Sequence, residues 1–215
     1  MDYTKILNQD LLMAYAKDPD EGLTQAFAGM ILSAVREGVL PPDMPIGLSR
    51  ERFARLLDRY FPGAWEALFE DYDTPEGETC PGLRAEEIDD LLMLLLEHCS
   101  NDGEHTIWLA YAIAAGCMGD NHLYHDMGLP SRQALSDLLK QNFTPLYEKN
   151  TGNMKWKKFL YKQLCDRAEV NLCQAPNCQV CHDYQVCFGP EEEMAHATRH
   201  MALAGKEEEK GLAGH

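Results

Sequence analysis

Apolar residues recur at helical spacing along nearly the whole chain, and this pattern restricts the chain to all-α folds. No run combines two-residue alternation with β-branched residues, so almost no sheet is expected. Ser49 and Ser131 each precede a periodic segment and are predicted helix N-caps, and Pro190 suits the first turn of a last helix. The predicted helices cover residues 4–17, 22–38, 49–60, 62–71, 84–99, 104–118, 131–142, 154–168 and 190–204.

The acidic residues are unevenly spread. The formal net charge is −16 at pH 7. Such an excess of acid opposes binding to nucleic acid, whose phosphates are contacted by Lys and Arg. Residues 1–153 hold 11 Lys and Arg against 26 Asp and Glu, a net charge of −15, whereas residues 154–190 hold five against three, a net charge of +2. The segment that leads into the C-terminal cysteines is therefore the least acidic part of the chain.

The N-terminal residues, MDYTKILNQD, lack the charged and apolar regions of a signal peptide. The longest apolar stretch, residues 107–118, falls short of the roughly 18 residues that a membrane span requires. We therefore expect a soluble, cytoplasmic, monomeric protein without membrane partners. In that reducing compartment, clustered cysteines indicate metal binding more often than disulfides.

Four of the eight cysteines form one array, Cys173-x4-Cys178-x2-Cys181-x5-Cys187. Four thiols within fifteen residues cannot share a helix face, so we expect a loop over 173–187 that curls around a metal centre. Thiolates are soft ligands, and four of them match an iron–sulfur cluster or a tetrahedral zinc. The compact spacing favours a cluster, because zinc sites usually pair two short knuckles that lie a dozen or more residues apart. The expected fold is an irregular helical bundle with a C-terminal cysteine-rich metal-cluster loop.

Three other functions remain open from the residues. A zinc-stapled structural or interaction domain predicts one zinc per chain, and a ferredoxin-like electron carrier predicts an iron–sulfur cluster and no other metal. A DNA-repair glycosylase with a cluster loop predicts a basic surface, which this acidic chain does not have. No phosphate-binding glycine loop and no nucleophile motif is present, so no catalytic residue is assigned.

The predicted helix before the array is amphipathic. Trp156, Phe159, Leu160 and Leu164 share one face at helical spacing, while three lysines follow another: Lys155, Lys158 and Lys162. Such lysines solvate an ordinary helix, but they also offset the charge of an anionic cluster or dock an acidic partner.

Further candidate ligands lie outside the array. Cys117, His122 and His125 form a Cys-x4-His-x2-His run in an irregular stretch, and His182 lies inside the array. Thiolate and imidazole both bind metals, so these side chains are candidate ligands, although Cys117 also suits a helix end as a small apolar residue.

The remaining Cys and His side chains have weaker signals. Cys165 is expected in the core, and the His196/His200 pair, at i and i+4, is expected to be solvated. Cys80 and Cys99 have no partner pattern.

The cysteine array resembles the signature of NifQ proteins in order, spacing and context. That context is WKKFLY at 156–161, LC at 164–165, CHDY at 181–184 and CFG at 187–189. The mid-chain motif, CMGDNHLYHDMGL at 117–129, is similar to the same family, with Tyr124 where members often carry Trp. The resemblance covers about residues 84–190, the motif-bearing core, whereas residues 1–83 match only as a variable helical part. We expect one domain over 1–204 and a disordered tail over 205–215.

The resemblance implies a nitrogen-fixation protein that binds an iron–sulfur cluster incorporating molybdenum, with molybdate as the source of the molybdenum. Such proteins supply molybdenum for the iron–molybdenum cofactor of nitrogenase. The implied partners are the cofactor scaffold complex and the nitrogenase iron protein. Cys173, Cys178, Cys181 and Cys187 would ligate the cluster, and His122 would bind molybdenum or guide molybdate. The protein would be a carrier rather than an enzyme.

Overall fold

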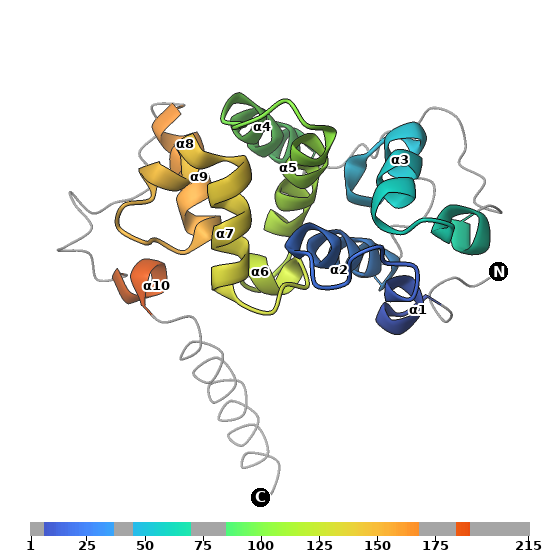
Figure 1. Ribbon diagram of the computed structural model, residues 1–215. Coiled ribbons are helices and arrows are strands. Elements are labelled where there is room, and N and C mark those ends of the chain that lie inside the picture. The colour runs from blue at the N-terminus through green and yellow to red at the C-terminus, as the bar shows by residue number, and fades with distance from the viewer. Residues whose placement is uncertain (1–6, 37–44, 70–84, 168–183, 190–215) are drawn as a thin grey trace, which may run out of the picture. The chain divides into compact units, whose positions relative to one another are not determined.

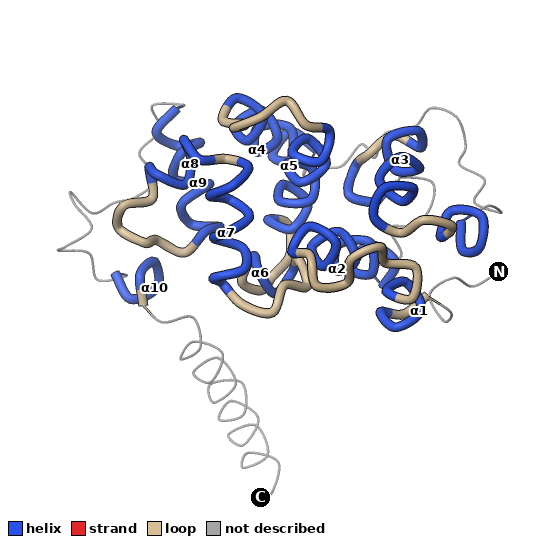
Figure 2. Tube along the Cα trace, in the orientation of Figure 1, coloured by secondary structure: helices blue, strands red, loops and turns tan. Residues whose placement is uncertain are grey.

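The structure is a computed structural model that describes residues 7–36, 45–69, 85–167 and 184–189 (Figure 1). Every regular element in these ranges is helical and none is a strand (Figure 2), which confirms the all-α prediction. The chain divides into two compact units, residues 1–150 and 151–215. Two compact units can belong to one folding domain, so the single domain expected over 1–204 stays a prediction.

The first unit contains most of the helices. They are α1 (Gln9–Met13), α2 (Gly22–Arg36), η2 (Pro45–Gly47), α3 (Arg50–Tyr60), η3 (Trp65–Phe69), α4 (Ala85–Glu97), α5 (Glu104–Cys117), α6 (Leu123–Asp126), α7 (Arg132–Asn142) and α8 (Thr144–Lys149). The second unit contains α9 (Trp156–Arg167) and α10 (Tyr184–Phe188). The helix expected over 190–204 and the tail over 205–215 lie outside the described residues.

Six predicted helices begin and end within two residues of their observed bounds: α2, α3, α4, α5, α7 and α9. Both serine caps are confirmed. The Ser49 hydroxyl accepts the Arg52 N–H at 3.4 Å, and the Ser131 hydroxyl accepts the Ala134 N–H at 3.2 Å. These caps are local features, which is why sequence spacing located them.

The observed helices differ from the prediction in three places. The helix expected over 4–17 is observed only as α1, because the Lys17 N–H donates instead to the Tyr60 carbonyl at 3.0 Å. The helix expected over 62–71 is a five-residue π-helix, η3. Helix α8 was not predicted; it begins one residue after Phe143 breaks helical geometry at φ −136° and ψ 49°.

Helix α5 forms the centre of the first unit. It is apolar on all sides, and its buried residues include Trp108, Leu109 and Ile113. Helices α2, α4 and α6 pack against it (Figure 1). A helix that is apolar all round is stable only when it is surrounded by other elements, so α5 organises the rest of the unit. In the described parts of the chain, every helix is too short or too polar to span a lipid bilayer.

A buried polar network joins the start of α5 to the end of α7. The Thr106 hydroxyl, fully buried, lies 2.7 Å from Asn101 Oδ1 and 3.1 Å from Asn142 Oδ1. The Asn142 amide donates to the Leu138 carbonyl at 2.9 Å, and the Asn142 carbonyl accepts the Ser100 N–H at 2.8 Å. The α4–α5 connection and the α7–α8 junction are thereby held together by hydrogen bonds.

Replacing Thr106 with valine is expected to lower the free energy of unfolding by about 1.5 kcal/mol, because the buried Asn142 side-chain oxygen loses its contact with the hydroxyl, whereas Asn101 Oδ1 still accepts the Gly103 N–H. The matched control is Thr24→Val. Thr24 is also fully buried, but its hydroxyl donates to the exposed carboxylate of Glu21 at 2.9 Å, which water can satisfy instead. Urea unfolding measures both variants, and equal losses would contradict the role of the network.

Candidate functional site

The mid-chain motif folds as a turn and a short helix between α5 and α7. Helix α5 ends at Cys117, and the chain passes through residues 118–121 before His122 begins α6 as its N-cap. Gly128, two residues after the end of α6, has a φ of +66°. Only glycine adopts that conformation without strain, so the motif's second glycine lets the chain leave α6 toward α7.

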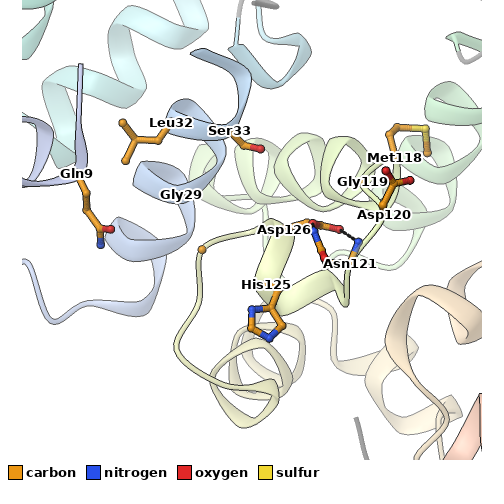
Figure 3. A pocket seen from close by; sticks show the side chains of 11 residues that line it. Gln9, Gly29, Leu32, Ser33, Met118, Gly119, Asp120, Asn121, His125 and Asp126 are labelled. Atoms are coloured by element: carbon orange, nitrogen blue, oxygen red, sulfur yellow. Dashed lines mark hydrogen bonds between the residues drawn. The ribbon is translucent and has the colours of Figure 1, made fainter. Parts of the chain in front are cut away.

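Asp126 holds the loop that precedes its own helix. Its carboxylate accepts the Asn121 backbone N–H at 3.1 Å and the Asn121 side-chain amide at 2.9 Å (Figure 3). The carboxylate also fills the space above Gly119, where an added Cβ would lie 2.5–2.9 Å from the three carboxyl atoms. Gly119, Asn121 and Asp126 therefore form one interlocked unit.

Helix α2 touches the end of the motif through two glycines. A Cβ on Gly29 would overlap the Met127 carbonyl oxygen and lie 2.7 Å from the Gly128 Cα. A Cβ on Gly128 would lie 2.6 Å from the Gly29 Cα. The two backbones meet with no room for any side chain, and this contact positions the motif against α2.

A polar pocket of about 500 Å³ lies between α1, α2 and the mid-chain motif (Figure 3). Its chemically active lining consists of two carboxylates, two amides, one hydroxyl and one imidazole: Asp120, Asp126, Gln9, Asn121, Ser33 and His125. The remaining lining residues are Gly29, Leu32, Met118, Gly119 and Gly128. The pocket offers mainly oxygen atoms, and its two carboxylates disfavour a bound anion.

The candidate ligands of the motif occupy different environments. Cys117 is only 5% exposed and sits at the end of α5. The rings of His122, Tyr124 and His125 cluster together, with centroid separations of 6.1 Å between His122 and Tyr124, 4.3 Å between Tyr124 and His125, and 6.4 Å between the two histidines. Within the described residues, no three His, Cys, Asp or Glu side chains gather closely enough to hold a metal ion. The metal roles suggested for Cys117 and His122 stay predictions.

The scattered cysteines also separate by environment. Cys99 donates its thiol to the Leu95 carbonyl at 3.7 Å, and burial, aided by the nearby charge of Asp102, raises its pKa. A raised pKa keeps this thiol protonated and makes it a poor metal ligand. Cys165 is half-buried on α9. Cys80, His196 and His200 lie outside the described residues.

The second unit places the end of the cysteine array. Cys187 is half-buried and lies on α10, so residues 184–187 of the loop expected over 173–187 are helical, while residues 173–183 lie outside the described residues. The Cys187 carbonyl accepts the Lys155 backbone N–H at 2.9 Å. A Cβ on Gly152 would lie 3.2 Å from the Phe188 ring, so the segment before α9 runs against α10. The other array members, Cys173, Cys178 and Cys181, and His182 lie outside the described residues.

The lysines of α9 do not share one face as predicted. Lys155 precedes α9 and is 5% exposed, whereas Lys158 is exposed and Lys162 pairs with Asp166 at 2.7 Å. On the opposite face, Trp156, Phe159 and Leu160 are buried as predicted, and the rings of the first two meet edge to face at 5.7 Å.

Comparison with known proteins decides the family. The family model described as NifQ matches residues 26–189, which include both the mid-chain motif and the cysteine array. The chain belongs to the NifQ family. It is 36% identical to Protein NifQ of Azotobacter vinelandii, over 75% of this chain and 86% of the relative, and 34% identical to Protein NifQ of Rhodobacter capsulatus, over 82% and 96%. No solved structure matches this chain.

Several residues that build the polar pocket were missed by sequence reasoning. The pocket depends on Gly29, Gly119 and Asp126, none of which was singled out. The first lies outside the motif, on α2, and no local pattern reveals which backbone it will touch. The other two belong to the motif. Their spacing of seven residues across a turn could have indicated that the Asp126 carboxylate lies against Gly119.

Proposed function

We propose that this NifQ protein is a carrier that holds molybdenum within an iron–sulfur cluster and supplies it for the iron–molybdenum cofactor of nitrogenase. The observation that carries this proposal is the four-cysteine array, which lies wholly inside the NifQ family match. The chemistry of the donors fits the cargo, because thiolates are the ligands that iron–sulfur clusters use. The recipients in this proposal are the cofactor scaffold complex and the nitrogenase iron protein in the cytoplasm.

The charges of the two candidate regions favour the cysteines as the place where cargo is held. The pocket presents the carboxylates of Asp120 and Asp126, which repel molybdate and other anions. The array instead lies within the segment 154–190, which has a net charge of +2, and its last member is hydrogen-bonded to the backbone of a lysine. In this proposal the array holds the molybdenum, and the pocket takes no part in its transfer.

The array suits a carrier because its ligands need not be equivalent. Three thiolates hold three irons of a cubane, and the fourth position can hold a different metal through a thiolate or a weaker ligand. A carrier must also release its cargo, which favours a site near the surface. Cys187 fits such a position, because it is half-buried rather than part of the core and lies on a five-residue helix.

The proposal is tested by metal analysis of oxygen-free protein after reconstitution with iron, sulfide and molybdate. We expect iron and molybdenum in the wild type, and transfer of the molybdenum to the cofactor scaffold complex in the presence of the nitrogenase iron protein. Cys187→Ala is expected to retain molybdenum more than about tenfold less well, because a ligand is lost. The matched control is Cys165→Ala, which removes another half-buried thiol of the same unit and is expected to load normally.

Two outcomes would contradict this assignment at different levels. Protein that contains only zinc, or no metal after reconstitution, would overturn the carrier proposal and favour a zinc-stapled domain. Iron without molybdenum would favour a ferredoxin-like electron carrier. Full loading and transfer by Cys187→Ala would exclude ligation by four thiolates while leaving the carrier function in place.

A further inference from the structure

Lys155 has an unusual environment for a lysine. It is 5% exposed, and it is the one charged side chain that is fully buried within the described part of the chain. Its ammonium nitrogen is buried and has no hydrogen-bond partner among the residues that the structure describes. A buried ammonium without a partner costs free energy, because it has lost its water and gained no counter-charge. Proteins keep such a group where something else supplies the missing interaction.

The backbone of Lys155 is fixed beside Cys187, the last cysteine of the array. Its N–H donates to the Cys187 carbonyl at 2.9 Å, and its carbonyl accepts the Phe159 N–H at 2.9 Å. The first bond joins it to the last cysteine of the array, and the second places it at the start of α9. The twelve residues of α9 add the positive end of a helix dipole at the same point.

The neighbouring lysines do not share this environment. Lys162 forms two contacts with the Asp166 carboxylate, at 2.7 and 2.9 Å, so its charge is already compensated. Lys158 is exposed to water. Lys155 thus combines burial, a missing partner and attachment to the array, whereas Lys158 and Lys162 have neither the burial nor the attachment.

We propose that Lys155 is a positioning residue whose buried ammonium pairs with the negative charge of the metal–sulfur cargo held by the cysteine array. This inference rests on the proposed carrier function. A cluster bound by thiolates carries net negative charge, and an ammonium removed from water interacts with it more strongly than a surface lysine would. Positive charge and hydrogen bonds near cluster sulfurs also raise the reduction potential. Lys155 therefore stabilises the loaded protein and destabilises the metal-free protein.

Lys155 is expected to stabilise the loaded protein and to destabilise the metal-free protein. A residue with only a structural role would not have opposite effects on the two forms. In Lys155→Met, the metal-free protein is expected to unfold at a higher temperature, because the unpaired charge is gone. After reconstitution with iron, sulfide and molybdate, the same variant is expected to retain molybdenum about tenfold less well. The cluster is also expected to have a lower reduction potential than in the wild type, measured by spectroelectrochemical titration.

The matched control is Lys158→Met, which removes the same charge from an exposed position one turn away and is expected to change none of the three quantities. Lys155→Gln repeats the measurement with a polar side chain if Lys155→Met does not fold. Wild-type levels of molybdenum and an unchanged potential in the Lys155 variants would overturn the inference while the carrier function stands. A wild type that takes up no iron or molybdenum overturns the carrier function, and the inference with it.

Discussion

Replacing Gly29 with alanine is expected to lower the free energy of unfolding by about 3 kcal/mol, measured by urea unfolding monitored by circular dichroism. The new methyl group would overlap the Met127 carbonyl oxygen and press on the Gly128 Cα. These are backbone atoms and cannot rotate away as a flexible side chain would. The gain in helix propensity, about 0.5–1 kcal/mol, is too small to offset the displacement of two backbones.

The control for this prediction is the same substitution in the same helix. At Gly22, the added Cβ would meet only the Leu138 side chain, at 3.4 Å. Gly22→Ala is therefore expected to change the free energy of unfolding by less than about 1 kcal/mol. Equal effects at the two positions would mean that α2 and the mid-chain motif do not approach as closely as the structure has them.

Gly119→Ala is expected to cost about 2 kcal/mol, because its methyl group would displace the Asp126 carboxylate from both hydrogen bonds with Asn121. Asp126→Ala is expected to cost a similar amount, since it removes the same hydrogen bonds directly. In the double variant the methyl group has room, so the combined loss is expected to fall short of the sum by about 1 kcal/mol or more.

The measurement is a double-mutant cycle in urea. Additive losses would show that Gly119 and Asp126 act separately and would contradict the interlocked unit. Asp120→Ala serves as the control. Asp120 is an exposed residue that lines the same pocket, but the hydrogen bond from the Asn121 amide goes to Asp126. Its effect on unfolding is expected to lie within about 0.5 kcal/mol.

The two NifQ motifs have different physical characters. The mid-chain motif is largely architectural. The Asp126 carboxylate accepts hydrogen bonds from Asn121 and lies close against Gly119, and Gly128 makes a left-handed turn. Under the proposed function, the array acts by binding metal, because a thiol contributes little to packing that another small residue could not contribute. Variants in the motif are therefore expected to act first on stability, and variants in the array first on metal retention.

The amino-acid sequence by itself determined the helical class, the bounds of six helices, both serine caps and membership of the NifQ family. These features depend on short-range spacing: apolar periodicity places helices, and a hydroxyl caps an amide three residues on. The tertiary structure alone decided that Gly29 meets Gly128, that Lys155 is buried while Lys158 is exposed, and that Cys187 lies on a helix. Burial and backbone approach depend on which distant segments pack together, and the spacing of residues along the chain does not contain that information.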